Sequence, residues 1–178
     1  MPLRLALRGI AFATSLLGPL AASAYAVDAT AEVRDRSGSV LGTVELTATP
    51  SGTMLIVAML RNVPEGTHGI HIHETGDCSA DDFSSAGGHL TGGREHGLMV
   101  EGGPHSGDLP NAHVTADGLL GVEVFNPYLT LSGDGEAAIF DADGSAFIVH
   151  ADPDDYETQP SGNAGDRIAC GVFRRTGG

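Results

Sequence analysis

Residues 42–60 read GTVELTATPSGTMLIVAML, and this segment indicates the architecture of the chain. In its first half, apolar residues at 44, 46 and 48 alternate with polar residues at 43, 45 and 47. Such alternation is typical of a strand with one buried face. Pro50-Ser51-Gly52 interrupts the pattern, and the apolar run 54–60 indicates a second, more buried strand. The segment therefore predicts two strands joined by a turn.

The rest of the chain continues this rhythm of short strands and turns. No stretch after Val27 has apolar residues at the helical period of 3.6. The 26 glycines, without a collagen-like repeat, favour tight turns and irregular loops. We therefore expect an all-β fold, an antiparallel sandwich or barrel. Further strands are predicted at 69–73, 121–125, 137–140, 146–150 and 168–173.

Two segments, 74–111 and 151–167, do not follow the strand rhythm. Both are long, polar and rich in Gly, and both contain or adjoin histidines. Loops of this length in a compact domain are usually functional or disordered. The histidines favour a function for both loops.

The first 26 residues have the composition of a removable export signal. Arg4 and Arg8 give a positive start, residues 10–22 are almost wholly apolar or small, and Ala24-Tyr25-Ala26 suits signal peptidase. A retained membrane anchor is the alternative, but the apolar run is short and no Lys or Arg stop signal follows it. We expect residues 1–26 to be a signal peptide and 27–178 to be one domain, periplasmic or secreted.

The charge of the chain argues against several kinds of partner. All nine basic residues are Arg. Removal of the signal takes the formal net charge from −14 to −16, because the signal has two arginines and no acidic residue. Such a chain has no basic surface for nucleic acid, and an anionic membrane repels it.

The predicted export decides how the two cysteines are interpreted. In an oxidising compartment, Cys78 and Cys170 are expected to form one disulfide that closes a loop of about 90 residues. Two buried free thiols are the alternative. The chain-entropy model gives such a link about 4–5 kcal/mol of stabilisation as an upper figure.

Six of the eight histidines have spacings that suit metal binding. His71 and His73 are one residue apart on a predicted strand, so both imidazoles leave the same face. Three or four imidazoles select copper or zinc, and an added carboxylate suits zinc. Each histidine alone has an alternative interpretation, as a surface residue or a hydrogen-bonded core residue. The remaining candidates are His89, His96 and His105 in the first long loop, Asp108 after them, and His150 at the end of a strand.

The chain contains four separated segments of interest: GIHIHE (69–74), AGGH (86–89), HSGDL (105–109) and GDRIACGV (165–172). They resemble the segments that define the copper/zinc superoxide dismutase family. They occur in the family's order, and the resemblance runs from about residue 30 to Phe173. The position of Cys78 is similar to that in the exported bacterial branch. The resemblance implies a Greek-key sandwich or barrel with two functional loops, which disproportionates superoxide to dioxygen and hydrogen peroxide.

The resemblance also implies a role for each matching residue. Arg167 would receive the superoxide anion, and Asp154 would link a copper histidine to a zinc histidine, here His71 and His96. The shared His89 would be a bridging imidazolate that also carries a proton. One copper ion per subunit would be held by His71, His73, His89 and His150. One zinc ion per subunit would be held by His89, His96, His105 and Asp108.

The chain departs from the family pattern in the zinc loop. No aromatic-x-proline follows the bridging histidine at Leu90-Thr91-Gly92, and the step from His89 to His96 is short. The path of this loop is therefore the least determined part of the prediction. Since Arg167 and Cys170 are only three residues apart, we also expect the disulfide to hold the guanidinium near the metal.

The second long loop is unusually acidic. Residues 151–166 contain five acidic side chains and no cation. This predicts weaker steering of an anionic substrate than the family usually has. A saline habitat is an alternative explanation of the acidic, Lys-free composition.

Two other function classes share part of the evidence. A protein that buffers or delivers copper or zinc explains the histidines, but it gives no reason for Arg167 or for a shared His89. A structural sandwich, such as an adhesion domain, explains the strands and the disulfide but leaves the histidines accidental. The exported branch contains monomers and dimers, and the sequence does not separate the two.

Overall fold

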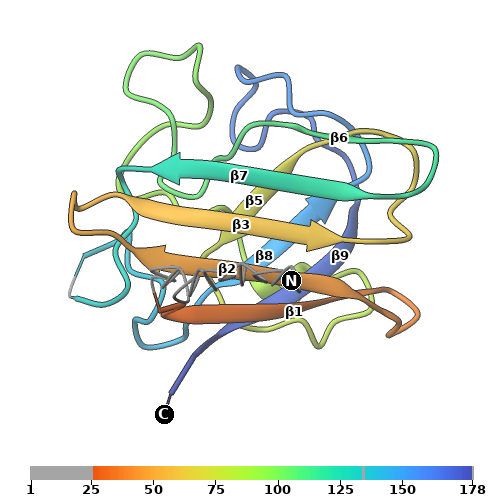
Figure 1. Cartoon of the computed structure of the whole chain (residues 1–178). Helices are drawn as coiled ribbons and strands as arrows, with labels where there is room; N and C mark the ends of the chain where they lie inside the picture. Colours follow the sequence, from red (N-terminus) through yellow and green to blue (C-terminus); the bar gives the residue numbers. More distant parts are fainter. Residues whose placement is uncertain (1–25, 134, 178) are drawn as a thin grey trace, which may run out of the picture.

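The computed structural model describes residues 26–133 and 135–177 (Figure 1). The predicted signal peptide lies outside these residues, except for Ala26. In this part of the chain no helix is long and apolar enough to cross a membrane, and the only helix is a single 3-10 turn, η1 (Ser84–Ala86). The strands are β1 (Ala29–Asp35), β2 (Val40–Ala48), β3 (Met54–Leu60), β4 (Gly66–His68), β5 (Ile70–His73), β6 (Ala112–Val114), β7 (Leu120–Asn126), β8 (Ala146–His150) and β9 (Arg167–Arg175).

Seven strands form one antiparallel sheet in the order β5-β8-β9-β1-β2-β3-β7, and β4 pairs separately with β6. Figure 1 shows β1, β2, β3 and β7 in front of β5, β8 and β9, so the sheet curls into two layers. The last strand, β9, lies between β1 and β8. This non-consecutive order is that of a Greek-key arrangement. The predicted all-β antiparallel fold is confirmed.

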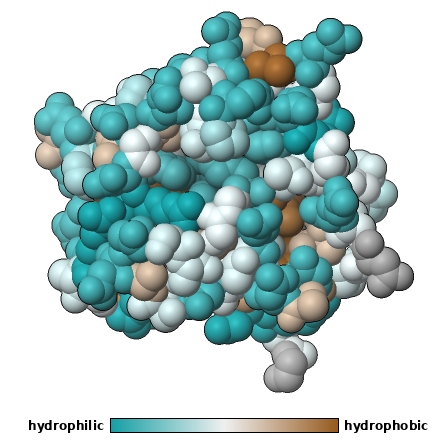
Figure 2. Space-filling model, turned by 180° about the vertical axis from the view of Figure 1, so that it is seen from behind, coloured by the Kyte–Doolittle hydropathy of each residue, from teal (hydrophilic) through white to brown (hydrophobic). Residues whose placement is uncertain are grey.

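The core lies between the two layers and follows from the alternation of the strands. In the β2–β3 pair, Leu46 faces Ile56 and Val44 faces Ala58, and all four side chains are buried. Burial of apolar side chains from both layers removes hydrocarbon from water, which is the main favourable term in folding. Figure 2 shows that the opposite face of the molecule is mostly hydrophilic, with only small separate hydrophobic areas.

The strand predicted at 137–140 is wrong. This segment belongs to the long connection between β7 and β8. Among the described residues its strand-like pairing is limited to one isolated bridge, between Ala138 and Thr130. Ile139 is nevertheless fully buried and packs with Leu129 in the core. The apolar run therefore reflects a loop whose side chains fill the core, and period alone does not separate such a run from a short buried strand. Strands β1, β4 and β6 were not predicted from the sequence.

Candidate metal centre

Strands β5 and β8 place three of the candidate histidines. The two strands pair antiparallel, with His71 opposite Ile148 and His73 opposite Ala146. His71 and His73 point to the same side of β5, as the period of two requires, and both are buried. His150 ends β8 opposite Arg167, at a shift in the register of β8 and β9.

The first long loop returns to β5 and adds the other candidate ligands. Backbone bridges place His89 opposite His73 and Asp108 opposite His71. The Ile72 N–H donates to the Gly107 carbonyl at 2.9 Å. A Cβ on residue 107 would lie 2.2 Å from the Ile72 carbonyl oxygen, so only glycine permits this approach. The close approach of the loop to β5 therefore explains the glycine of the HSGDL segment.

The histidines and Asp108 form two groups that share one ring. The ligand atoms within each group lie within 4.8 Å of one another. His89 belongs to both groups, with its ring centroid 3.9 Å from that of His71 and 5.3 Å from that of His96. The first group is His71, His73, His89 and His150, and the second is His89, His96, His105 and Asp108.

In the first group, one nitrogen of each ring has a fixed partner. The His73 Nδ1–H donates to the Gly87 carbonyl at 3.0 Å and the His150 Nδ1–H to the Gly165 carbonyl at 3.2 Å. Because a carbonyl only accepts, these contacts place the proton on Nδ1 and a lone pair on Nε2. Within the described residues, four buried ring nitrogens of this group have no hydrogen-bond partner: His71 Nδ1, His73 Nε2, His89 Nε2 and His150 Nε2.

In the second group, three ring nitrogens surround one carboxylate. The nearest oxygen of Asp108 is 2.9 Å from His89 Nδ1, 3.1 Å from His96 Nδ1 and 3.3 Å from His105 Nδ1. Asp108 Oδ2, the oxygen nearest to His96 Nδ1, also accepts the backbone N–H groups of Gly97 and His105. Three nitrogens and one oxygen are the donor set that suits a tetrahedral zinc ion.

Asp154 connects the two groups from behind. Asp154 is 3% exposed. Its carboxylate accepts hydrogen bonds from His71 Nε2 at 2.7 Å and from His96 Nε2 at 3.1 Å. The Asn111 amide holds the Asp154 backbone, because it donates to its carbonyl and accepts its N–H, both at 2.8 Å. A carboxylate in this position fixes the tautomer and orientation of both rings.

The environment of the first group keeps its imidazoles neutral. Burial, with the neighbouring His89 and His150, holds the pKa of His71 well below its usual value. Burial also lowers the pKa of His73 and of His89. The pKa of His150 falls to about 4 for the same reason, although its bond to the Gly165 carbonyl opposes the shift. Neutral imidazoles have the free lone pair that a metal needs.

The pKa of the Asp108 carboxyl is also lowered, but by hydrogen bonds and against the effect of burial. Burial acts to raise the pKa of this carboxyl, but hydrogen bonds from His105, His89 and the Gly97 backbone outweigh it. The pKa is therefore held well below its usual range. Asp108 remains an anion under all ordinary conditions, which favours a cation among the surrounding nitrogens.

Arg167 lies beside the first group and is held by the loop that follows Cys78. Its guanidinium donates to the Phe83 and Gly87 carbonyls, each at 2.6 Å. Gly87 therefore joins Arg167 to His73 through one carbonyl oxygen. Burial lowers the pKa of Arg167 from its usual value, and Asp82 opposes the shift. The guanidinium remains a cation at physiological pH.

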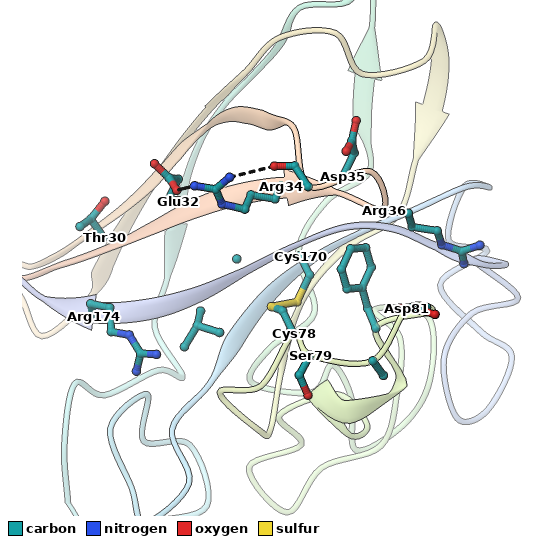
Figure 3. Close-up of a pocket in the computed structure, with 15 residues that line it drawn as sticks. Thr30, Glu32, Arg34, Asp35, Arg36, Cys78, Ser79, Asp81, Cys170 and Arg174 are labelled. Carbon is teal, nitrogen blue, oxygen red and sulfur yellow. Dashed lines mark hydrogen bonds and ion pairs between the residues drawn. A yellow bond between two sulfur atoms is a disulfide. The ribbon is translucent and has the colours of Figure 1, made fainter.

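The expected disulfide between Cys78 and Cys170 is present, with a Cα–Cα distance of 5.9 Å. It joins the loop to β9, three residues after Arg167 (Figure 3). A pocket of about 510 Å³ lies beside it, lined among others by Arg34, Arg36 and Arg174. The disulfide thus anchors the loop whose carbonyls hold the guanidinium.

The structure brings together every residue that the sequence analysis singled out for the site. Three contributors were missed: Asn111, which holds Asp154; Gly107, which lets the loop reach β5; and Gln159, which contacts the His96 backbone. Gly107 was visible within the HSGDL segment. Neither amide had a signal in the sequence, because each acts on a residue more than 40 positions away.

Comparisons with known proteins agree on one family. The family model described as copper/zinc superoxide dismutase matches residues 40–173. A copper/zinc superoxide dismutase of Caulobacter vibrioides is 44% identical over 149 residues, which cover 82% of this chain and 85% of that protein. A second one, from Aquifex aeolicus, is 40% identical over 163 residues, covering 91% and 95%.

A solved structure shows the same fold. The crystal structure of a superoxide-dismutase-like protein from Bacillus subtilis superposes with a TM-score of 0.76 at 39% identity, covering 80% of this chain and 96% of that one. Family model, relatives and fold all point the same way. The chain therefore belongs to the copper/zinc superoxide dismutase family.

Proposed function

We propose that this protein disproportionates superoxide at a paired copper and zinc centre, with one ion of each metal per subunit. Two superoxide anions and two protons give dioxygen and hydrogen peroxide. The observation that carries the proposal is the sharing of His89 between two complete donor groups. Family membership alone is a weaker argument, since a fold can be kept while its site changes.

The donor groups suggest which metal each one takes. We assign copper to His71, His73, His89 and His150, whose four unpartnered nitrogens are all imidazole. We assign zinc to His89, His96, His105 and Asp108, which combine three nitrogens with a carboxylate. When bound, copper supplies the one-electron redox chemistry, and zinc supplies a positive charge that does not change oxidation state.

The chain's own residues perform the remaining steps. We assign binding of the superoxide anion to Arg167, whose two bonds to loop carbonyls fix its guanidinium beside His73. His89 has one nitrogen in each group, so its Nε2 is the atom that can hold a proton and release it toward the product. Asp154 orients His71 and His96 together, and so keeps the two halves in one geometry.

We also propose that the protein works outside the cytoplasm. Residues 1–26 would direct export and be removed, leaving residues 27–178 as the mature domain, in the periplasm or secreted. The disulfide supports an oxidising compartment. The net acidic charge disfavours nucleic acid and anionic membranes as partners. The mature protein would be a monomer or a homodimer.

The test is metal analysis together with a dismutation assay on the exported protein. We expect one copper and one zinc per chain, rapid superoxide consumption, and its loss in His150→Ala, which removes a copper ligand but leaves the zinc group complete. A protein that only buffers or delivers metal would bind both ions and show no dismutation. That result, with both sites filled, would overturn the proposal.

A further inference from the structure

One side chain from the second long loop holds the backbone of His96. The Gln159 amide oxygen accepts the His96 N–H at 3.0 Å, and its amide nitrogen donates to the His96 carbonyl at 2.8 Å. The two residues are 63 positions apart. The amide therefore satisfies both polar backbone groups of one residue, as a neighbouring strand would.

The residues next to this contact are also closely packed. Gly97 has a φ of +94°, and a Cβ there would lie 2.1 Å from the Tyr156 carbonyl oxygen. The same carbonyl accepts the Met99 N–H at 3.2 Å. Residues 96–99 of the zinc loop thus lie directly against residues 156–159. The segment from His89 to His96 is short, and residues 156–159 of the second long loop support its end.

His96 needs this support more than the copper histidines do. His71, His73 and His150 belong to strands, whereas none of the described strands includes His96. Its ring contacts Asp108 and Asp154, and those contacts act on the imidazole. Asp108 also accepts the N–H of the next residue, Gly97, but it does not bind the N–H or the carbonyl of His96 itself. Within the part of the chain that the structure describes, both hydrogen bonds of the His96 backbone go to Gln159.

We propose that Gln159 is a positioning residue for zinc, which fixes the backbone of His96 so that its Nδ1 meets the other three donors. This inference rests on the proposed zinc site. It makes zinc retention depend on the loop 151–167 at a point separate from Asp154. Copper retention does not depend on Gln159, because the copper histidines have sheet or backbone partners of their own.

The experiment compares zinc and copper affinity in Gln159→Met, which has a similar length but no amide. Both metals are titrated into the full mature chain against chelators of known affinity. Loss of an outer-shell contact typically costs about 10- to 100-fold in metal affinity. Because Gln159 is exposed and water competes for its bonds, we expect a rise of about 10-fold in the zinc dissociation constant. The copper constant should change less than about threefold.

Two further variants make the result specific. Glu157→Gln changes an exposed neighbour in the same loop and should leave zinc affinity within about twofold of the unaltered protein. Gln159→Glu keeps an acceptor for the His96 N–H but loses the donor. Its zinc affinity should therefore lie between those of the unaltered protein and of Gln159→Met. With cobalt in the zinc site, the visible spectrum should shift in Gln159→Met and not in Glu157→Gln, because the ligand geometry has changed.

Several results would overturn the inference. The first is a Gln159→Met variant whose zinc affinity and cobalt spectrum equal those of the unaltered protein. If Gln159→Met does not fold, the same result in Gln159→Glu overturns the inference. An equal loss of copper and zinc affinity would show a general structural role. If the unaltered protein binds dismutation-competent copper but no zinc, both this inference and the proposed zinc site fail. If it binds zinc and Gln159 matters, but dismutation is absent, only the proposed function fails.

Discussion

The copper half and the zinc half of the site share His89 but are built on different supports. Three of the four residues assigned to copper belong to the hydrogen-bonded strands β5 and β8, with His73 and His150 at the ends of these strands. The three residues that complete the zinc group belong to one loop, and their positions depend on contacts with other loop residues. Groups on strands are held more precisely than groups on loops. The zinc half therefore needs help from distant residues, which Asp154 and Gln159 supply.

The copper half has a covalent restraint as well. The disulfide from Cys78 to Cys170 anchors the loop that ends near His89, and this loop supplies the carbonyls that hold Arg167 and His73. On the zinc side, the second long loop is joined to the first by hydrogen bonds and packing, without a covalent link.

Removal of the disulfide should have the largest effect. Cys78→Ser opens a loop with a sequence separation of 92, so we expect about 4 kcal/mol less free energy of unfolding, measured by urea denaturation. Addition of a reductant should then cause no further loss in the variant. With both metals fully loaded, dismutation should also fall, because the loop no longer holds Arg167. Full activity in the loaded variant would refute the restraint on the copper half.

Acid should destabilise the metal-free protein through the copper half. The pKa of His150 is about 4 in the fold and about 6.5 in an unfolded chain. Between these values the unfolded chain binds a proton that the folded chain does not, so stability falls as pH drops from 6.5 toward 4. For His150 alone the loss is on the order of 3 kcal/mol.

Urea unfolding of chelator-treated protein at several pH values measures this effect. The lowered pKa values of His71 and His73 add to it with the same sign. The carboxyl of Asp108 acts differently, because its lowered pKa keeps it ionised through this whole window. His150→Gln should flatten part of the profile. A stability that does not change between pH 7 and 4.5 would contradict the burial argument.

Asp154→Asn should weaken both metals, but zinc more than copper. Its carboxylate accepts from one ring of each half, and an amide can accept from only one of them. Loss of such a contact typically costs about 10- to 100-fold in affinity. His71 is also fixed by β5, whereas His96 lies in a loop. Competitive titration of each metal gives the two ratios, and a larger loss for copper would reverse the comparison.

Ionic strength should have the smallest effect. The second long loop has five acidic side chains and no cation between 151 and 166, so it adds little long-range attraction for superoxide. We expect the second-order rate constant to change less than about twofold, or to rise slightly, between 0.01 and 0.2 M salt. Pulse radiolysis or stopped-flow kinetics measures it. A steep fall with added salt would show that Arg167 and the metals steer the anion despite the acidic loop.

Much of the fold was accessible from the sequence, and several of the misses have a physical reason. The strand at 42–48 was predicted from its period of two, since one face of it is buried, and the strand at 54–60 was predicted from its apolar run. The segment 137–140 has the same apolar character, yet it fills the core from a loop. The short strands β4 and β6 have three residues each, too few to show a period. The local pattern of apolar residues indicates which side chains are buried. Whether a segment pairs as a strand depends on partners elsewhere in the chain.

The amino-acid sequence by itself determined the fold class, the family resemblance and the candidate ligands, because imidazoles, carboxylates and strand periodicity are properties of residue type and local spacing. The tertiary structure decided which nitrogen of each imidazole faces a metal, since the other nitrogen is occupied by Gly87, Gly165 or Asp154. It also decided how His96 is supported, through Gln159. These contacts join residues far apart in the chain, and hydrogen bonds act only over a few ångströms. Only the folded arrangement brings such groups within reach.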